Sequence, residues 1–459
     1  MSLARSLATG EKPEITGIHH VSPRVATRGL GDTYYLRFNK QKTFFMSHDD
    51  SVHSINEIPA DENIRLGGFG RRVFVISGLV GILALAAGIA FGWARHDGWR
   101  YFFHSYLLNY CFVLSLALGT LFFTALQHIT RAGWSVVIRR PAECLAAGFS
   151  CLAILFLPIL IPVLLGNAVL YLWADPAAVA GDELLRHKVA YLQPTFFAFR
   201  AVGYFAAWLF LTRYFLTHSL RQDRTADAAE TLRMERLGPA AMLLLAGTVT
   251  FAAIDWLMSL SPDWYSTIFG VYFFAGIAVA GLSILILTCL CLQATGRLAR
   301  VITVEHYHDL GKLLLTFVVF WGYIAFSQYL LIWYGDIPEE TRWYLARQSG
   351  GWKWIAVVFL LSGNCLIPFC GLLPRFVKRR KLLLGFWALW LLAMHWIDLY
   401  WIIMPNLGGE KPPFDIMDIC LLVGMFGVYI AGAVRAAGDN SLVPLADPRL
   451  KESLNFENT

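Results

Sequence analysis

The sequence predicts an all-α, polytopic membrane protein with about ten transmembrane helices. Hydrophobic residues make up 57% of the 459-residue chain and charged residues only 15%, which is more apolar than a soluble domain can bury. Many apolar runs approach the roughly 20 residues that a helix needs to cross a hydrocarbon core of about 30 Å. We therefore expect a lipid bilayer to surround most of the chain, and we expect no nucleic-acid partner.

Composition divides the chain into an arm, a membrane domain and a tail. Residues 1–72 form a polar N-terminal arm without a cleavable signal peptide, because the first apolar run begins only after Arg71 and Arg72. We expect this arm to be extended and to lie on a partner. The ten-helix domain covers 73–436, and a polar C-terminal tail covers 437–459. The predicted spans are 73–93, 105–128, 143–170, 194–218, 238–260, 265–292, 309–334, 352–373, 382–404 and 415–436.

The eight cysteines indicate neither a haem nor a metal site. Seven of them lie inside apolar runs, and the sequence has no Cys-x-x-Cys-His motif that would attach a c-type haem. It also has no Cys-x-x-Cys pair of the kind that holds zinc or an iron–sulfur cluster. We interpret the cysteines as small buried apolar side chains and expect no metal on this chain.

Basic residues are distributed unequally between the two sets of loops. The N-terminal arm and the loops after the second, fourth, sixth and eighth spans are richer in arginine and lysine than the opposite loops, and Arg131, Arg139 and Arg140 belong to the richer set. Because Lys and Arg are enriched in cytoplasmic loops, both termini are predicted to be cytoplasmic. The turn between the fifth and sixth spans then faces the outside.

That turn carries an acid within an apolar segment. Pro262 marks the turn, and Asp255 precedes it by about two helical turns, still inside the fifth span. An acid inside a membrane helix costs roughly 2.5–3.5 kcal/mol on insertion scales. Asp255 is therefore a candidate functional residue near the outer face.

Other ionisable and polar groups fall near the ends of the predicted spans. His395 and Asp398 are spaced i, i+3 on the ninth span, so they share a helix face near the outer side. Because His, Asp and hydroxyl or amide groups can accept and pass protons, the pattern is typical of a proton relay. The candidates are Asp255, His395, Asp398, His308, Asp309, Gln328, His128 and Arg131.

Each candidate also has a plain structural interpretation. His308 and Asp309 stand where a helix would begin, a position that favours Asp. His128 and Arg131 fit interfacial side chains that reach towards the polar headgroups. Asp255 and the His395–Asp398 pair fit hydrogen bonds between helices. The histidines do not form two facing pairs, so the sequence gives little support to a b-type haem.

Four segments carry a family resemblance. They are HITRAGWSVVIRRPAE at 128–143, DWLMSLSPDWYSTIFGVYFFAG at 255–276, HDLGKLLLTFVVFWGYIAFSQYLLIWYGDIPEET at 308–341 and HWIDLYWIIMPN at 395–406. Together they resemble the second large membrane subunit of alternative complex III, a bacterial quinol:cytochrome c oxidoreductase, within the wider NrfD/polysulfide-reductase membrane-anchor family. The resemblance extends over nearly all of residues 65–440.

The resemblance implies a subunit with two four-helix bundles and an outer pair of helices, in the bacterial inner (cytoplasmic) membrane. It implies no haem or iron–sulfur cluster on this chain, although quinone contact is possible. The implied partners are a paralogous NrfD-like membrane subunit, a multihaem cytochrome c subunit, a periplasmic iron–sulfur subunit and small membrane anchors. Quinol oxidation is assigned to the paralogue, and this subunit's implied role is structural and proton-conducting.

The resulting hypothesis is a proton path. Its inner half would run from His128 and His308–Asp309 past Gln328, and its outer half past Asp255 and the His395–Asp398 pair. Two other classes remain open. A proton-coupled secondary transporter would show an internal repeat with broken helices, and no convincing repeat is visible. A purely structural anchor would use the polar groups only to join helices.

Overall fold

The structure is a computed structural model that describes residues 58, 59 and 61–458, all within the unit Met46–Thr459. These described residues form helices and loops without a β-strand, apart from one isolated bridge between Asn63 and Arg297. Ten helical segments in this part of the chain are long and apolar enough to cross a membrane. The prediction of an all-α polytopic membrane protein is confirmed, whereas the predicted arm lies outside the described residues as far as residue 57.

The ten spans follow the predicted order. They are α2 (Gly67–Ala94), α3 (Arg100–Ile129), α4–α6 (Val136–Leu164), α9 (Pro194–Thr225), α10 with the turn η2 (Ala229–Leu260), α11 (Phe269–Ala294), α12 (Val304–Gly335), α14–η3–α15 (Trp352–Leu372), α17 with the turn η4 (Lys381–Leu407) and α18 (Ile416–Ala437). The short helices η1 (Leu172–Ala174), α7 (Pro176–Gly181), α8 (Glu183–Lys188), α13 (Pro338–Gln348), α16 (Arg375–Arg379) and α19 (Leu450–Leu454) lie outside the spans.

The third span is broken, and it begins earlier than its predicted start at residue 143. Its pieces are α4 (Val136–Ala147), α5 (Phe149–Leu155) and α6 (Leu157–Leu164). Pro158 and Pro162 both lie in α6, and a proline removes a backbone donor and clashes with the preceding turn. Tyr106 donates a hydrogen bond of 2.8 Å to the carbonyl of Leu155 beside the break. A neighbouring helix thus satisfies backbone that the break exposes.

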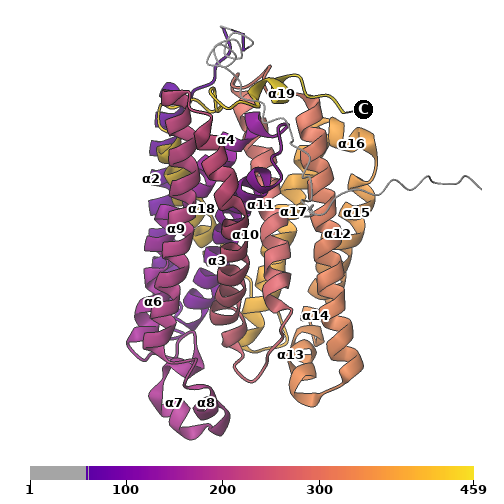
Figure 1. Cartoon of the computed structure of the whole chain (residues 1–459). Coiled ribbons are helices and arrows are strands. Elements are labelled where there is room, and N and C mark those ends of the chain that lie inside the picture. The colour runs from indigo at the N-terminus through magenta and orange to yellow at the C-terminus, as the bar shows by residue number, and fades with distance from the viewer. Residues whose placement is uncertain (1–57, 60, 459) are drawn as a thin grey trace, which may run out of the picture. The chain divides into compact units, whose positions relative to one another are not determined.

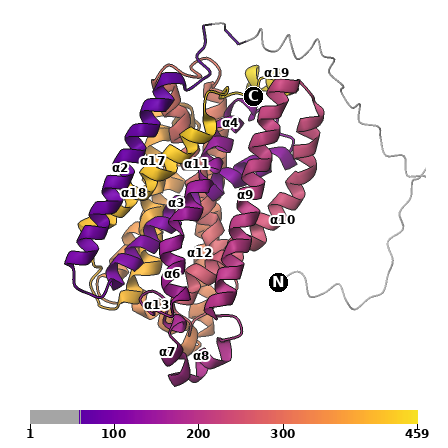
Figure 2. The same ribbon diagram turned by 90° about the vertical axis from the view of Figure 1, so that its left-hand side faces the viewer.

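The spans form two four-helix bundles and an outer pair (Figures 1 and 2). The first bundle contains α3, α4–α6, α9 and α10, and the second contains α11, α12, α14–α15 and α17. The two bundles meet where α3 packs on α11 and α17. As a result α3 is enclosed on all sides, and every residue of its most apolar window is buried. This arrangement agrees with the one that the family resemblance implies.

The outer pair consists of α2 and α18, the first and last spans. Glycines allow the two backbones to approach closely: a Cβ added at Gly81 would lie 2.8 Å from the backbone nitrogen of Val428, and one at Gly427 would lie 2.6 Å from the carbonyl oxygen of Ser77. Small residues at such crossings permit tight van der Waals packing in a bilayer. Much of the opposite face of α2 is exposed.

Both ends of the described chain lie at the same end of the bundle, as an even number of spans requires. The backbone N–H of Leu442 donates to the carbonyl of Ile64 at 2.7 Å. We call this the arginine-rich end, since its loops belong to the set that is richer in basic residues. The opposite end, which carries α7, α8 and α13 (Figure 1), is the hairpin end. The cytoplasmic location of the arginine-rich end stays a prediction.

Candidate functional site: buried polar groups of the bundle

Asp255 lies at the last turn of α10 and is paired with a cation. Its carboxylate is fully buried and accepts two hydrogen bonds from Arg200 of α9, from Nε at 2.8 Å and from Nη2 at 2.9 Å. The hydroxyl of Tyr204 donates a third at 2.7 Å. Two-pronged contact of this kind holds a carboxylate firmly. Asp255 therefore joins α9 to α10 near the hairpin end, and its charge is compensated.

Asp398 of α17 is buried to the same degree but has different partners. The hydroxyl of Tyr272 on α11 donates to Oδ1, and the indole N–H of Trp321 on α12 donates to Oδ2 at 3.2 Å. No basic side chain in the described part of the chain forms an ion pair with it. Its partners in the described part of the chain therefore provide none of the charge compensation that Arg200 gives Asp255. Asp398 thus links α17 to α11 and α12 through two neutral hydrogen-bond donors.

His395 lies one turn away on α17 but faces a different helix. Its Nε2 is 2.9 Å from the hydroxyl of Ser115 on α3, while its Nδ1 has no hydrogen-bond partner within the described residues. A Cβ at Gly276 of α11 would lie 2.6 Å from the ring, so a glycine is what allows the ring to fit there. The i, i+3 spacing predicts a shared face with Asp398; the structure gives His395 and Asp398 separate partners.

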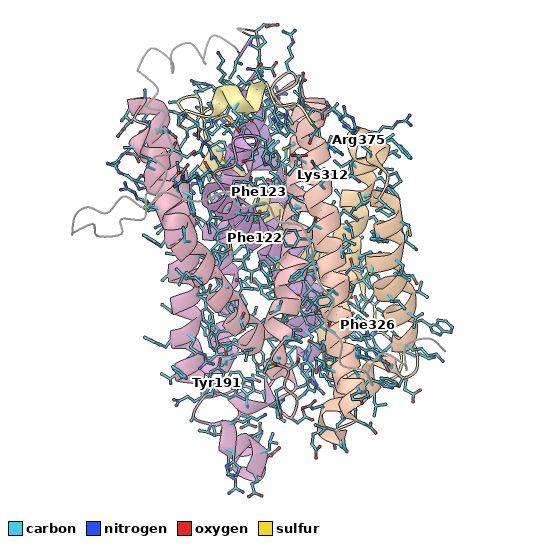
Figure 3. All side chains as sticks on the ribbon, turned by 45° about the vertical axis from the view of Figure 1, so that its right-hand side comes forward. Phe122, Phe123, Tyr191, Lys312, Phe326 and Arg375 are labelled. Carbon is cyan, nitrogen blue, oxygen red and sulfur yellow. The ribbon has the colours of Figure 1, made fainter. Side chains whose placement is uncertain are left out.

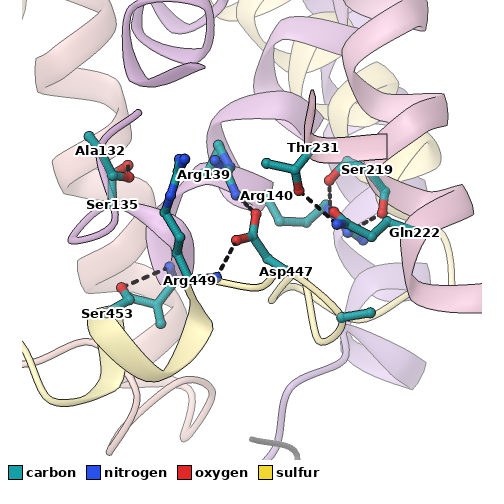
Figure 4. A network of polar contacts seen from close by, with 12 residues as sticks. Ala132, Ser135, Arg139, Arg140, Ser219, Gln222, Thr231, Asp447, Arg449 and Ser453 are labelled. Atoms are coloured by element: carbon teal, nitrogen blue, oxygen red, sulfur yellow. Dashed lines mark hydrogen bonds and ion pairs between the residues drawn. The ribbon is translucent and has the colours of Figure 1, made fainter. Parts of the chain in front are cut away.

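Arg139 and Arg140 are buried ionic groups and not the loop cations that the distribution of basic residues predicted. Both lie in α4 at about 1% exposure. Arg139 pairs with Asp447, and both are labelled in Figure 4. Arg140 pairs with Glu143 at 3.2 Å and with Asp223 at 2.9 Å. Charges can be buried here because each meets an opposite charge.

The C-terminal tail completes this cluster. Residues 441–454 fold across the arginine-rich end, where the Ser453 hydroxyl donates to the carbonyl of Trp134 at 2.6 Å and Arg449 pairs with Glu235 at 2.6 Å. Val443 and Leu450 are fully buried. The segment predicted as a polar tail is therefore part of the packed core at this end.

His128 and Arg131 end α3 and the following turn, close to the tail. The Arg131 side chain is 65% exposed and pairs with Glu235 at 3.2 Å, which suits an interfacial residue. His128 is 1% exposed, stacks on Phe215 at 5.2 Å, and neither ring nitrogen has a hydrogen-bond partner within the described residues. Both oxygens of Glu143 also lack a hydrogen bond of normal geometry in this part of the chain. Buried polar atoms without a hydrogen-bond partner in the protein are typically hydrated by internal water.

His308 and Asp309 lie in the second turn of α12, at the arginine-rich end. Asp309 forms an ion pair with Lys312 on the same helix. His308 is 7% exposed, and its Nδ1 has no partner among the described residues. The helix itself begins earlier, at Val304, so neither residue is the helix start that the structural interpretation assumed.

Gln328 does not belong to the inner half of a path that begins at His308. It lies near the far end of α12, where its amide donates to the hydroxyl of Tyr344 at 3.0 Å. In Figure 3, Lys312 lies at the arginine-rich end, whereas Phe326 of the same helix lies towards the hairpin end. Twenty residues of helix separate His308 from Gln328, which is about 30 Å at 1.5 Å per residue. Gln328 therefore lies in the half of the bundle near the hairpin end, and not in the inner half through which the hypothesised path ran past it.

A pocket of about 330 Å³ opens at the hairpin end beside Asp255. It is lined by residues of the 187–192 segment, the end of α10 and the turn between Pro262 and Tyr265. Trp264, which lines it, stacks on Trp343 at 4.3 Å, and its indole N–H has no partner within the described residues. Burial and the neighbouring Asp255 carboxylate raise the pKa of Tyr191, another lining residue. The pocket thus offers polar aromatic side chains in apolar surroundings.

The described residues contain no group of three or more His, Cys, Asp or Glu side chains that could hold a metal ion. The partners Arg200, Tyr204, Tyr272, Trp321 and Ser115 were missed by sequence reasoning. Arg200 offered a signal, because a cation inside the predicted span 194–218 needs a partner. The aromatic and hydroxyl partners offered none, since they are common throughout membrane helices.

Fold and site together define a polytopic α-helical membrane protein whose apolar bundle encloses ionisable groups at both ends and near its middle. Comparison of the sequence with models of protein families and with curated proteins gives no match.

Proposed function

We propose that this chain is an integral membrane subunit of a respiratory quinol:electron-acceptor oxidoreductase of the alternative complex III type, and that its polar interior conducts protons. The resemblance of the four segments supports the first part. The arrangement in two bundles and an outer pair agrees with that family. The proposed location is the bacterial inner membrane, with the arginine-rich end in the cytoplasm.

The observation that carries the proton-conducting part is the environment of Asp398. A buried carboxyl held by a tyrosine hydroxyl and an indole N–H, without a cation, exchanges a proton at lower cost than one held by arginine. His395 is one turn away, and its Nδ1 has no hydrogen-bond partner among the described residues. Imidazole nitrogens accept and return protons readily.

The fully enclosed helix α3 offers the connection towards the arginine-rich end. Ser115 of this helix contacts His395. Five residues further along, Thr120 begins a row on a different face of the helix, which Thr124 and His128 continue at spacings of four residues. Thirteen residues separate Ser115 from His128, which is about 20 Å at 1.5 Å per residue. Internal water between these groups would complete the path, and we expect it at the His128 ring nitrogens, which have no hydrogen-bond partner among the described residues.

This path differs from the one that the sequence alone suggested. Asp255 is held by Arg200, so it serves to join helices, and Gln328 belongs to the hairpin end. Asp398, His395, Ser115 and His128 carry the proposed path. His308 and Asp309 lie at the same end of the bundle as His128, and we propose them as a second point of entry for protons.

The partners proposed for this chain hold the redox centres. They are a paralogous membrane subunit, a multihaem cytochrome c subunit, a periplasmic iron–sulfur subunit and small membrane anchors. Haem c and iron–sulfur clusters belong to those chains. A quinone headgroup suits the pocket beside Asp255, where Trp264 and Tyr191 would hold it by donating hydrogen bonds to its carbonyl oxygens.

Purification through a tag on this chain in mild detergent tests the proposal. We expect a stable assembly that stains for covalent haem and contains an iron–sulfur subunit by mass identification. A haem-free monomer or homo-oligomer would refute the respiratory assignment and favour a transporter. In the purified assembly, Asp398→Asn should reduce proton release per quinol oxidised while the assembly stays intact. Unchanged proton release in that variant would refute the proton path alone.

A further inference from the structure

A groove of about 510 Å³ lies between the start of α2 and the end of α18, at the arginine-rich end. Both helices belong to the outer pair, and every residue that lines the groove lies in α2, in α18 or directly after α18. Its lining includes Gly67, Gly68, Arg71 and Phe74 from α2 and Arg435 and Asp439 from the other side.

Two of the lining residues are unpaired cations. The side chains of Arg71 and Arg435 are exposed, and neither forms an ion pair or hydrogen bond with another residue in the described part of the chain. Asp439 stands on the rim as the one opposing charge that lines the groove. Arginine side chains bind phosphate oxygens through directed, charge-assisted hydrogen bonds. The groove therefore has the chemistry of a phosphate site.

The backbone at the floor of the groove adds to this charge. The first N–H groups of a helix have no partner within it and carry partial positive charge. No side chain caps the start of α2. A Cβ added at Gly67 or Gly68 would have no other atom within 4 Å, so an approaching group can reach this backbone.

A stripe of exposed apolar side chains extends from the groove along the outer face of α2. Phe74 lines the groove, and Val75, Leu79 and Leu83 follow at helical spacing, each more than half exposed. From Arg71 to Leu83 the helix rises about 18 Å, slightly more than half of a hydrocarbon core of about 30 Å. Arginines that can contact a lipid headgroup, next to an apolar helix face of this length, match one leaflet of a bilayer.

We propose that this groove binds an anionic phospholipid, with its phosphate on Arg71 and Arg435 and an acyl chain along α2. Basic pockets between transmembrane helices are known lipid-headgroup sites. The proposal stands apart from the proposed function, because it rests on α2 and α18 alone. It makes the outer pair a lipid-binding surface of the subunit.

Native mass spectrometry of the full-length chain tests it. The chain is released from nanodiscs that contain equal amounts of phosphatidylglycerol and phosphatidylcholine with the same acyl chains. We expect retention of phosphatidylglycerol over phosphatidylcholine. Each arginine near a membrane surface contributes about a fivefold preference, so Arg71→Ala with Arg435→Ala should remove most of the selectivity. Arg72→Ala is the matched control, because Arg72 is adjacent and exposed but does not line the groove.

Asp439→Ala provides a test in the opposite direction. Removal of the opposing carboxylate should increase retention, an outcome that does not depend on how well the double variant folds. Equal retention of the two lipids by the native chain, or equal losses in Arg72→Ala and in the double variant, would overturn the proposal. Displacement of the lipid by millimolar inorganic phosphate would show a free-phosphate site and would overturn the lipid assignment.

Discussion

Asp255 and Asp398 are the same residue type at similar burial, but their hydrogen-bond partners differ in charge. In the first bundle Asp255 meets a guanidinium and a hydroxyl, so three donors fix its carboxylate. In the second bundle Asp398 meets a hydroxyl and an indole, both neutral. The difference teaches that burial alone does not make an acid functional. Under the proposed proton path, charge compensation decides whether a buried acid joins helices or exchanges protons.

The largest effect is expected from breaking the Asp255 pair. Arg200→Met leaves a buried carboxylate without its cation, and removal of one partner of a buried ion pair costs about 3–5 kcal/mol. Chemical unfolding of the purified chain in detergent measures the loss. Arg213→Met is the control, because Arg213 lies exposed on the same helix and forms no ion pair within the described residues. A second change, Asp255→Asn, should restore much of the loss, and a loss below about 1 kcal/mol in Arg200→Met would contradict this reading.

The next effect concerns Asp398. In Asp398→Asn one of the two neutral donors faces the new amide N–H₂, so we expect a loss of about 1–3 kcal/mol. Stability should therefore fall less than in Arg200→Met, while proton release in the assembled complex falls more. If Asp398→Asn proved as destabilising as Arg200→Met, Asp398 would be an ionised carboxylate that joins helices, like Asp255.

The two tyrosines allow a matched comparison. Tyr204→Phe removes one donor from Asp255, and Tyr272→Phe removes one from Asp398, each at about 0.5–1.5 kcal/mol of stability. Because Arg200 continues to hold Asp255, only Tyr272→Phe should change proton release. The same response of proton release in both variants would remove the proposed distinction between the bundles.

The smallest effect is expected at Ser115. Ser115→Ala removes the contact to His395 Nε2 and should cost about 0.5–1.5 kcal/mol, with a slower proton release if the path follows α3. Ser283→Ala is the control, since Ser283 is fully buried on α11 and its hydroxyl has no partner among the described residues. Loss of the same size in both variants would mean that the Ser115–His395 contact has no special role.

The sequence by itself determined the class of this protein, the order of its ten spans and the location of the two ends of the ten-span domain on one side. Those features follow from long apolar runs and from the even number of crossings, and both can be read along a single chain. The sequence also singled out Asp255 and Asp398 as costly residues. It treated them alike, because a one-dimensional pattern shows burial but not partners.

Only the tertiary structure decided which partners each polar group has. It brought Arg200 to Asp255 across 55 residues of chain and Asp447 to Arg139 across 308, distances over which no local pattern operates. It also turned the polar tail into part of the core and moved Gln328 to the hairpin end. The physical reason is that an ionisable group in an apolar bundle is defined by the partners that helix packing supplies, and packing is a property of the assembled helices.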